Sequence, residues 1–115
     1  MESNIAIEAL GALAQETRLA VFRLLVRAGA AGMTAGTIAR TLEVAPSTLS
    51  SHLGILERAG LLQSWRVQRQ IFYAADYAGV RDLLAFLTED CCQGRPEICA
   101  PLPEAAAAPN EATGA

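Results

Sequence analysis

Apolar residues recur at helical spacing along most of the first ninety positions. The spacing predicts helices over residues 5–14, 17–28, 35–42, 47–59 and 77–88. Two short stretches, 61–67 and 71–74, instead predict strands that are joined around Gln68 and Arg69 as a hairpin. The expected fold is therefore mainly α with a small β-hairpin, in the order helix, helix, helix, helix, strand, strand, helix.

Residues at the ends of these segments support the same boundaries. Thr34 is placed to cap the third helix, and Pro46 fits the first turn of the fourth, where its missing N–H needs no partner. Gly60 is a suitable stop after that helix. Each predicted helix carries an apolar stripe. We expect two of these stripes to face the core, namely Ile38 and Leu42 in the third helix and Leu49, Leu53 and Leu56 in the fourth. The stripes of the first, second and last helices are Ile5, Ala9, Leu10 and Leu13; Leu19, Phe22, Leu25 and Val26; and Val80, Leu83, Leu84 and Leu87.

Length and composition limit the class of protein. A chain of 115 residues with 52% hydrophobic residues suits one compact domain. Residues 100–115 hold three prolines and an alanine-rich filler, which indicates a flexible tail after a domain over residues 1–99. Because no apolar run reaches roughly 18 residues and no signal peptide begins the chain, we expect a soluble, cytoplasmic protein without a membrane partner.

The net charge of −3 excludes a protein that is basic all over, but the charge is unevenly distributed. Residues 1–75 hold seven Arg and five acidic residues, whereas residues 76–115 hold two Arg and seven acidic residues. Phosphate affinity depends on where the cations lie. A modestly basic face within residues 34–75 predicts weak nonspecific binding, so DNA recognition would need specific contacts.

The segment from residue 34 to residue 62 has the pattern of a helix-turn-helix, whose second helix can lie in a major groove. We expect its exposed face to carry small polar side chains, which let a helix approach base edges closely. The alternative is that these residues are only caps and solvated positions. The expected DNA-reading residues are Ser47, Thr48, Ser50, Ser51 and His52.

A polar hairpin follows this second helix directly. Arg66, Gln68 and Arg69 would project from it as a wing along the DNA backbone. A single charged hairpin is usually a solvated turn, but its place after a helix-turn-helix is more specific. Trp65 and Phe72 are expected to pack within the hairpin.

Three stretches, taken in order, resemble the ArsR/SmtB family of metal-sensing winged-helix repressors. They are ALAQETRLAVFRLL at residues 12–25, IARTL at 38–42 and STLSSHLGILERAGLL at 47–62, and a wing ending in IFY at 71–73 agrees with them. The resemblance implies a homodimer formed by the first and last helices, which represses a metal- or metalloid-resistance operon on double-stranded operator DNA. We expect no enzyme activity, because the sequence offers no catalytic Cys–His neighbourhood.

The chain departs from two familiar sensor sites of that family. The helix before the recognition helix lacks the Cys-x-Cys of the best-known arsenic sensors, and a single histidine excludes a His-rich zinc site on the last helix. All three cysteines, Cys91, Cys92 and Cys99, follow the last helix. This arrangement resembles the arsenic-responsive branch with C-terminal cysteines.

Three thiolates suit As(III), which binds three sulfur atoms in a pyramid, and they suit Sb(III) equally. Zinc or cadmium would need a fourth ligand, which Glu89, Asp90, Glu97 or water could supply. A redox switch through a Cys92–Cys99 disulfide is a further alternative. The cysteines could also be incidental. The sequence thus predicts a DNA-binding repressor that As(III) releases, with Cd/Zn-responsive or thiol-redox repressors as alternatives.

Overall fold

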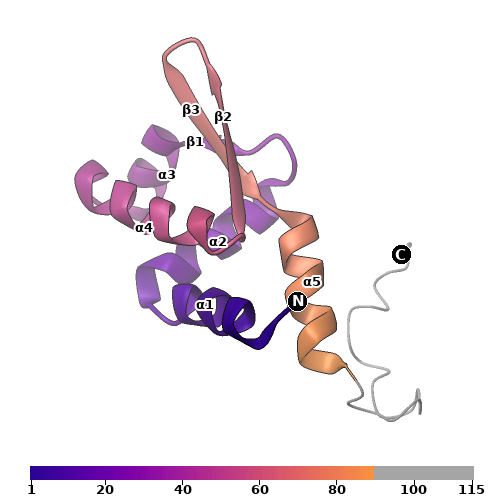
Figure 1. Cartoon of the computed structure of the whole chain (residues 1–115). Coiled ribbons are helices and arrows are strands. Elements are labelled where there is room, and N and C mark those ends of the chain that lie inside the picture. The colour runs from indigo at the N-terminus through magenta and orange to yellow at the C-terminus, as the bar shows by residue number, and fades with distance from the viewer. Residues whose placement is uncertain (90–115) are drawn as a thin grey trace. The chain divides into compact units, whose positions relative to one another are not determined.

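A computed structural model describes residues 1–89 of the chain (Figure 1). It divides into two units, of which residues 1–84 form the first and residues 85–115 the second. The last helix begins in the first unit and ends in the second. The elements are α1 (Ser3–Leu13), α2 (Glu16–Ala28), β1 (Met33–Thr34), α3 (Ala35–Leu42), α4 (Pro46–Arg58), β2 (Leu62–Val67), β3 (Gln70–Ala75) and α5 (Tyr77–Thr88).

The mainly helical fold and its hairpin are confirmed, and the element ends follow the expected local chemistry. The Thr34 hydroxyl accepts a hydrogen bond from the Thr37 N–H at the start of α3 (3.2 Å), and Pro46 is the first residue of α4. Gly60 follows that helix with φ of 83°. α3 and α5 have the predicted bounds, and the other helices and the hairpin strands differ by one or two residues.

The expected order omitted one strand. β1 pairs antiparallel with β3, with Met33 opposite Tyr73 and Thr34 opposite Phe72, so the sheet has three strands in the order β1-β3-β2. A strand of two residues is too short to show alternation in the sequence. The corrected order is helix, helix, strand, helix, helix, strand, strand, helix.

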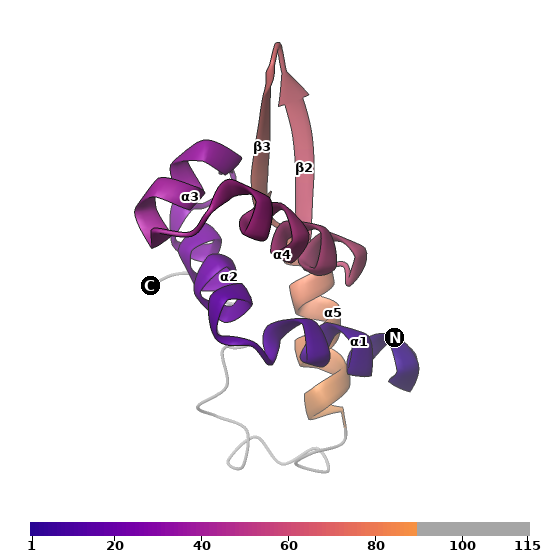
Figure 2. The ribbon, with the colours of Figure 1, turned by 90° about the vertical axis from the view of Figure 1, so that its left-hand side faces the viewer.

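The core of the first unit lies between α2, α3, α4 and the start of β2. Leu49, Leu53 and Leu56 are confirmed as the buried face of α4, and α3 buries Ile38 and Ala39. Leu42 is only half-buried. The large, fully buried side chains of this core are Val21, Leu25, Ile38, Leu49, Leu53, Leu56 and Leu61. The hairpin of β2 and β3 projects beyond the helices (Figure 2).

The apolar stripes of α1, α2 and α5 face the core less than their spacing suggested. α1 buries Ala6, Ala9 and Ala12, while Ile5 and Leu10 are exposed. In α2 the buried residues are Val21 and Leu25, while Leu19 and Val26 are exposed, and α5 buries Leu83 alone. Helical spacing reports where apolar residues recur but not which side of the helix meets a partner in the same chain.

The first turn of α5 is fixed against the end of α4. The Asp76 N–H donates to the carbonyl of Leu61 (2.9 Å), and the Asp76 carboxylate accepts from the Gly79 N–H (3.2 Å). A Cβ on Gly79 would overlap the Gly60 carbonyl oxygen, so the two backbones meet directly. The Tyr77 hydroxyl also donates to the carbonyl of Val26 in α2 (3.4 Å).

Candidate DNA-binding surface

The face of α4 opposite its three buried leucines is small and polar. At 100° per residue, the outermost stripe of this helix is Ser47, Ser51, Gly54 and Arg58. Both serines and Arg58 are exposed. A Cβ on Gly54 would lie 3.2 Å from Nη1 of Arg58, so the guanidinium lies over the glycine. The stripe therefore carries hydroxyls towards its N-terminal end and a cation towards its C-terminal end.

Thr48 and Ser50 lie on the two flanks of this stripe and are exposed. The five expected DNA-reading residues therefore all lie on α4, four of them exposed. Hydroxyls at these positions can donate to or accept from base edges and phosphates.

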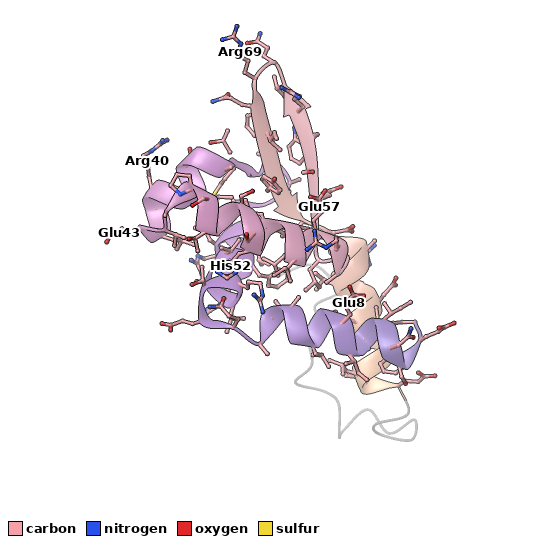
Figure 3. The ribbon with its side chains drawn as sticks, turned by 60° about the vertical axis from the view of Figure 1, so that its left-hand side comes forward. Glu8, Arg40, Glu43, His52, Glu57 and Arg69 are labelled. Carbon is pink, nitrogen blue, oxygen red and sulfur yellow. The ribbon has the colours of Figure 1, made fainter. Side chains whose placement is uncertain are left out.

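His52 differs from the other four because its side chain is half-buried and bonded within the chain. Its Nδ1 lies 3.3 Å from Nη1 of Arg18 at the start of α2. Arg18 also donates from Nε to the carbonyl of Ala12 (2.6 Å). His52 thus lies at the edge of the exposed face, on the side of α4 towards α1 and α2 (Figure 3).

The wing carries its cations at and beside a two-residue turn. Val67 pairs with Gln70, so Gln68 and Arg69 form the loop, and Gln68 has φ of 56°. The Arg66 guanidinium folds back and donates from Nε to the Gln68 carbonyl (3.0 Å). Arg69 projects from the tip (Figure 3). All three residues are exposed, as a phosphate contact requires.

Aromatic packing supports the wing, as the sequence predicted. The rings of Trp65 and Phe72 are stacked, with centroids 5.8 Å apart and planes 11° apart. Gly32 lies beneath this pair, since a Cβ there would be 3.0 Å from Cη2 of Trp65.

The Glu57 carboxylate connects α4 to strand β2 of the wing. The Ser64 hydroxyl donates to Oε2 of Glu57 (2.7 Å), and Ser64 pairs with Tyr73 across the hairpin. Burial, and secondarily the negative charge of Glu57, raise the pKa of Tyr73 above its ordinary value of 10.0. Glu57 is the one acidic side chain of α4, so the outer stripe itself carries no negative charge.

Three arginines that the sequence pattern did not single out belong to this surface or support it. Arg58 could have been found, because it follows Ser47 and Ser51 at helical spacing. Arg40 is exposed on α3, and its Nη2 donates to the Thr37 hydroxyl (3.3 Å). Arg18 is 34 residues from His52, so no local pattern links the two.

The predicted metal ligands Cys91, Cys92 and Cys99 lie outside the described residues. Within residues 1–89, no group of three or more His, Cys, Asp or Glu side chains is arranged to hold a metal ion. None of the helices in that range is both long enough and apolar enough to cross a membrane.

Known proteins match this fold over most of its length. Residues 13–64 match the family described as a helix-turn-helix domain. The transcriptional activator HlyU of Vibrio cholerae is 30% identical over 95 residues, which are 81% of this chain and 85% of HlyU. Its solved structure has a TM-score of 0.62, covering 81% of this chain and all of the solved one.

Two further structures extend the comparison. An ArsR-like transcriptional regulator from Rhodococcus sp. RHA1 is 27% identical, covering 90% of this chain and 93% of that one, with a TM-score of 0.66. The homodimeric winged helix-turn-helix domain of Mb0332 from Mycobacterium bovis shares the fold at 22% identity and a TM-score of 0.60, covering 80% of this chain and 85% of that one. With its helix-turn-helix, wing and HlyU-like sequence, the chain belongs to the ArsR-type winged-helix family of DNA-binding transcriptional regulators.

Proposed function

We propose that this regulator is a homodimeric repressor of an arsenic-resistance operon, which leaves its operator when As(III) or Sb(III) binds three cysteine thiolates. The observation that carries the proposal is the position of every cysteine in the chain, Cys91, Cys92 and Cys99, within nine residues just beyond α5. Soft thiolates select thiophilic ions, and three sulfurs complete the preferred shell of trivalent arsenic. The resemblance to family members with C-terminal cysteines supports the same inducer.

Operator binding follows from the surface of α4 and the wing. The small outer stripe lets α4 approach base edges in the major groove, where Ser47, Thr48, Ser50 and Ser51 donate or accept. His52, Arg66, Gln68 and Arg69 contact the flanking backbone. Arg58, at the end of the same stripe, adds a phosphate contact.

Dimerisation is supported by the outward face of α1. Ile7 is 68% exposed and Leu10, three residues further along and so on the same face of the helix, is 40% exposed. A second copy would cover it. The Mb0332 domain, which shares this fold, is homodimeric. A dimer also places two recognition helices on half-sites one helical turn apart.

Release of the operator requires only a small coupling free energy between ion binding at the thiolates and DNA binding. Capture of one ion by all three sulfurs would bring Cys91, Cys92 and Cys99 together. A changed distance between the two α4 helices would then mismatch the two half-sites. A tenfold loss of operator affinity corresponds to about 1.4 kcal/mol of coupling.

The test is a titration of the operator complex with arsenite, antimonite, zinc, cadmium and peroxide in separate mobility-shift experiments. Arsenite and antimonite should release the DNA. Cys91→Ser, Cys92→Ser and Cys99→Ser should each keep operator affinity within about twofold while losing most of the arsenite response. The triple variant, which should still bind DNA without an inducer, is the control for folding.

Other outcomes point to the alternatives. Release by zinc or cadmium alone would replace the arsenic assignment with a divalent-metal sensor of the same fold. Release by peroxide, reversed by reductant, with no response to arsenite would indicate a thiol redox switch. A single serine variant that still responded fully to arsenite would remove that cysteine from the site.

A further inference from the structure

Arg18 joins three helices at the edge of the candidate DNA-binding surface. Its backbone N–H donates to the Gln15 side chain at the start of α2 (2.8 Å), and its Nε donates to the Ala12 carbonyl in the last turn of α1. Its Nη1 lies 3.3 Å from Nδ1 of His52 on α4. The guanidinium is therefore held at two points, one of them on the DNA-reading helix.

The chemistry of the two groups fixes the direction of the second contact. A guanidinium has only N–H donors and no acceptor, so Nδ1 must accept with its lone pair. A neutral imidazole that accepts at Nδ1 carries its proton on Nε2. Within residues 1–89, Nε2 makes no hydrogen bond of its own. It is left as a neutral N–H donor on a half-buried ring.

We propose that Arg18 is a positioning residue for operator binding, which holds His52 in the Nε2–H tautomer so that the ring donates to a phosphate oxygen of the operator. This inference rests on the proposed function. His52 lies at the edge of α4 and not on the outermost stripe, so the sugar–phosphate backbone beside the groove is its expected partner. Without Arg18 the ring loses the hydrogen bond at Nδ1 and is free to rotate or exchange its tautomer.

The arrangement also explains why a half-buried ring is suited to DNA contact. A ring that is already held at Nδ1 loses little rotational freedom when Nε2 contacts the DNA. The entropic cost of ordering the ring on binding is therefore smaller.

The tautomer is tested in the DNA-free protein by nitrogen-15 NMR of the ring, in mildly alkaline buffer where imidazole is neutral. His52 is the only histidine of the chain, so its two ring nitrogens are assigned without ambiguity. The unchanged protein should show a single tautomer with the proton on Nε2, and Arg18→Met should show a mixture. A proton on Nδ1, or a mixture already in the unchanged protein, would overturn the proposal.

The role in binding is tested by a double-mutant cycle on operator affinity. Arg18→Met should weaken binding about tenfold when His52 is present, but less than about twofold in a His52→Phe background, where no N–H remains to be positioned. Arg18→Lys, which keeps a donor, should recover part of the loss. Arg23→Met removes the same charge from an exposed site on α2 and serves as the matched control.

The outcomes separate this inference from the function on which it rests. Equal weakening by Arg18→Met in both backgrounds would overturn action through His52 and leave operator binding intact. A failure of the unchanged protein to bind any operator DNA would overturn the proposed function, and the binding role of Arg18 with it. Should Arg18→Met unfold, the spectrum of the unchanged protein together with Arg18→Lys still decides the assignment.

Discussion

Gly32 is closely confined by the neighbouring strand β3. It has φ of 70°, and a Cβ would lie 2.5 Å from the carbonyl oxygen of Tyr73. Gly32→Ala should therefore lower the free energy of unfolding by about 2–4 kcal/mol, through overpacking and left-handed backbone strain. Urea denaturation followed by circular dichroism measures the change.

Gly36→Ala is the matched control for that substitution. Gly36 lies in the first turn of α3, where a Cβ would meet only the Arg40 guanidinium at 3.5 Å, an ordinary van der Waals distance. Alanine there should leave stability unchanged or raise it by up to about 1 kcal/mol, because it is the better helix former. Equal decreases in the free energy of unfolding for Gly32→Ala and Gly36→Ala would contradict steric confinement at Gly32.

Single residues differ in how far the sequence reveals their role. The leucines of α4 and the cap at Thr34 were predictable, since periodicity and capping act within a few residues. The half-burial of His52 was not, because it depends on Arg18 from a distant turn. The hydroxyls of α4 could be selected from the sequence, but which of them lie outermost depends on the buried side of the helix.

Among the elements, α4 and the hairpin meet through Glu57, Ser64 and Tyr73. Because burial and Glu57 raise the pKa of Tyr73, the folded protein holds the phenolic proton more tightly than the unfolded chain does. The stabilisation is complete below about pH 10 and is lost as the pH rises through the folded-state pKa. Urea midpoints measured from about pH 8 to 11 should fall more steeply for the unchanged protein than for Tyr73→Phe.

Glu57→Gln separates the two causes of this shift. Removing the carboxylate charge should reduce the alkaline loss but not abolish it, since burial of the ring remains the larger cause. An alkaline loss of the same size in Tyr73→Phe would show that another group is responsible.

Element order was predictable except where an element is very short. The turn at Gln68 and Arg69 and the aromatic pair on the strands identified the hairpin, because both signals are local. β1 depends on pairing with β3, about forty residues further along, and its two residues carry no pattern. In α1 the helix itself was predicted from the spacing of its large apolar residues, but most of these residues face away from the core.

For the molecule as a whole, the outward apolar face of α1 has a direct test. Ile7→Glu should convert the proposed dimer to a monomer in analytical ultracentrifugation and weaken operator binding by at least about tenfold, because a charge would be buried at the interface. Gln63→Glu adds the same charge on exposed β2 and should leave the dimer intact. A dimer of unchanged stability with Ile7→Glu would place the interface elsewhere.

The contact between Gly60 and Gly79 leaves no room for a side chain on Gly79 at the start of α5. The first turn of α5 is capped by Asp76, and the Gly60 carbonyl oxygen lies against Gly79 with no side chain between the two backbones. Alanine at Gly79 would therefore have to displace the Gly60 carbonyl, and with it the connection between α4 and β2. Alanine at Gly60 would meet no atom, so that position is restricted by its φ of 83° and not by space.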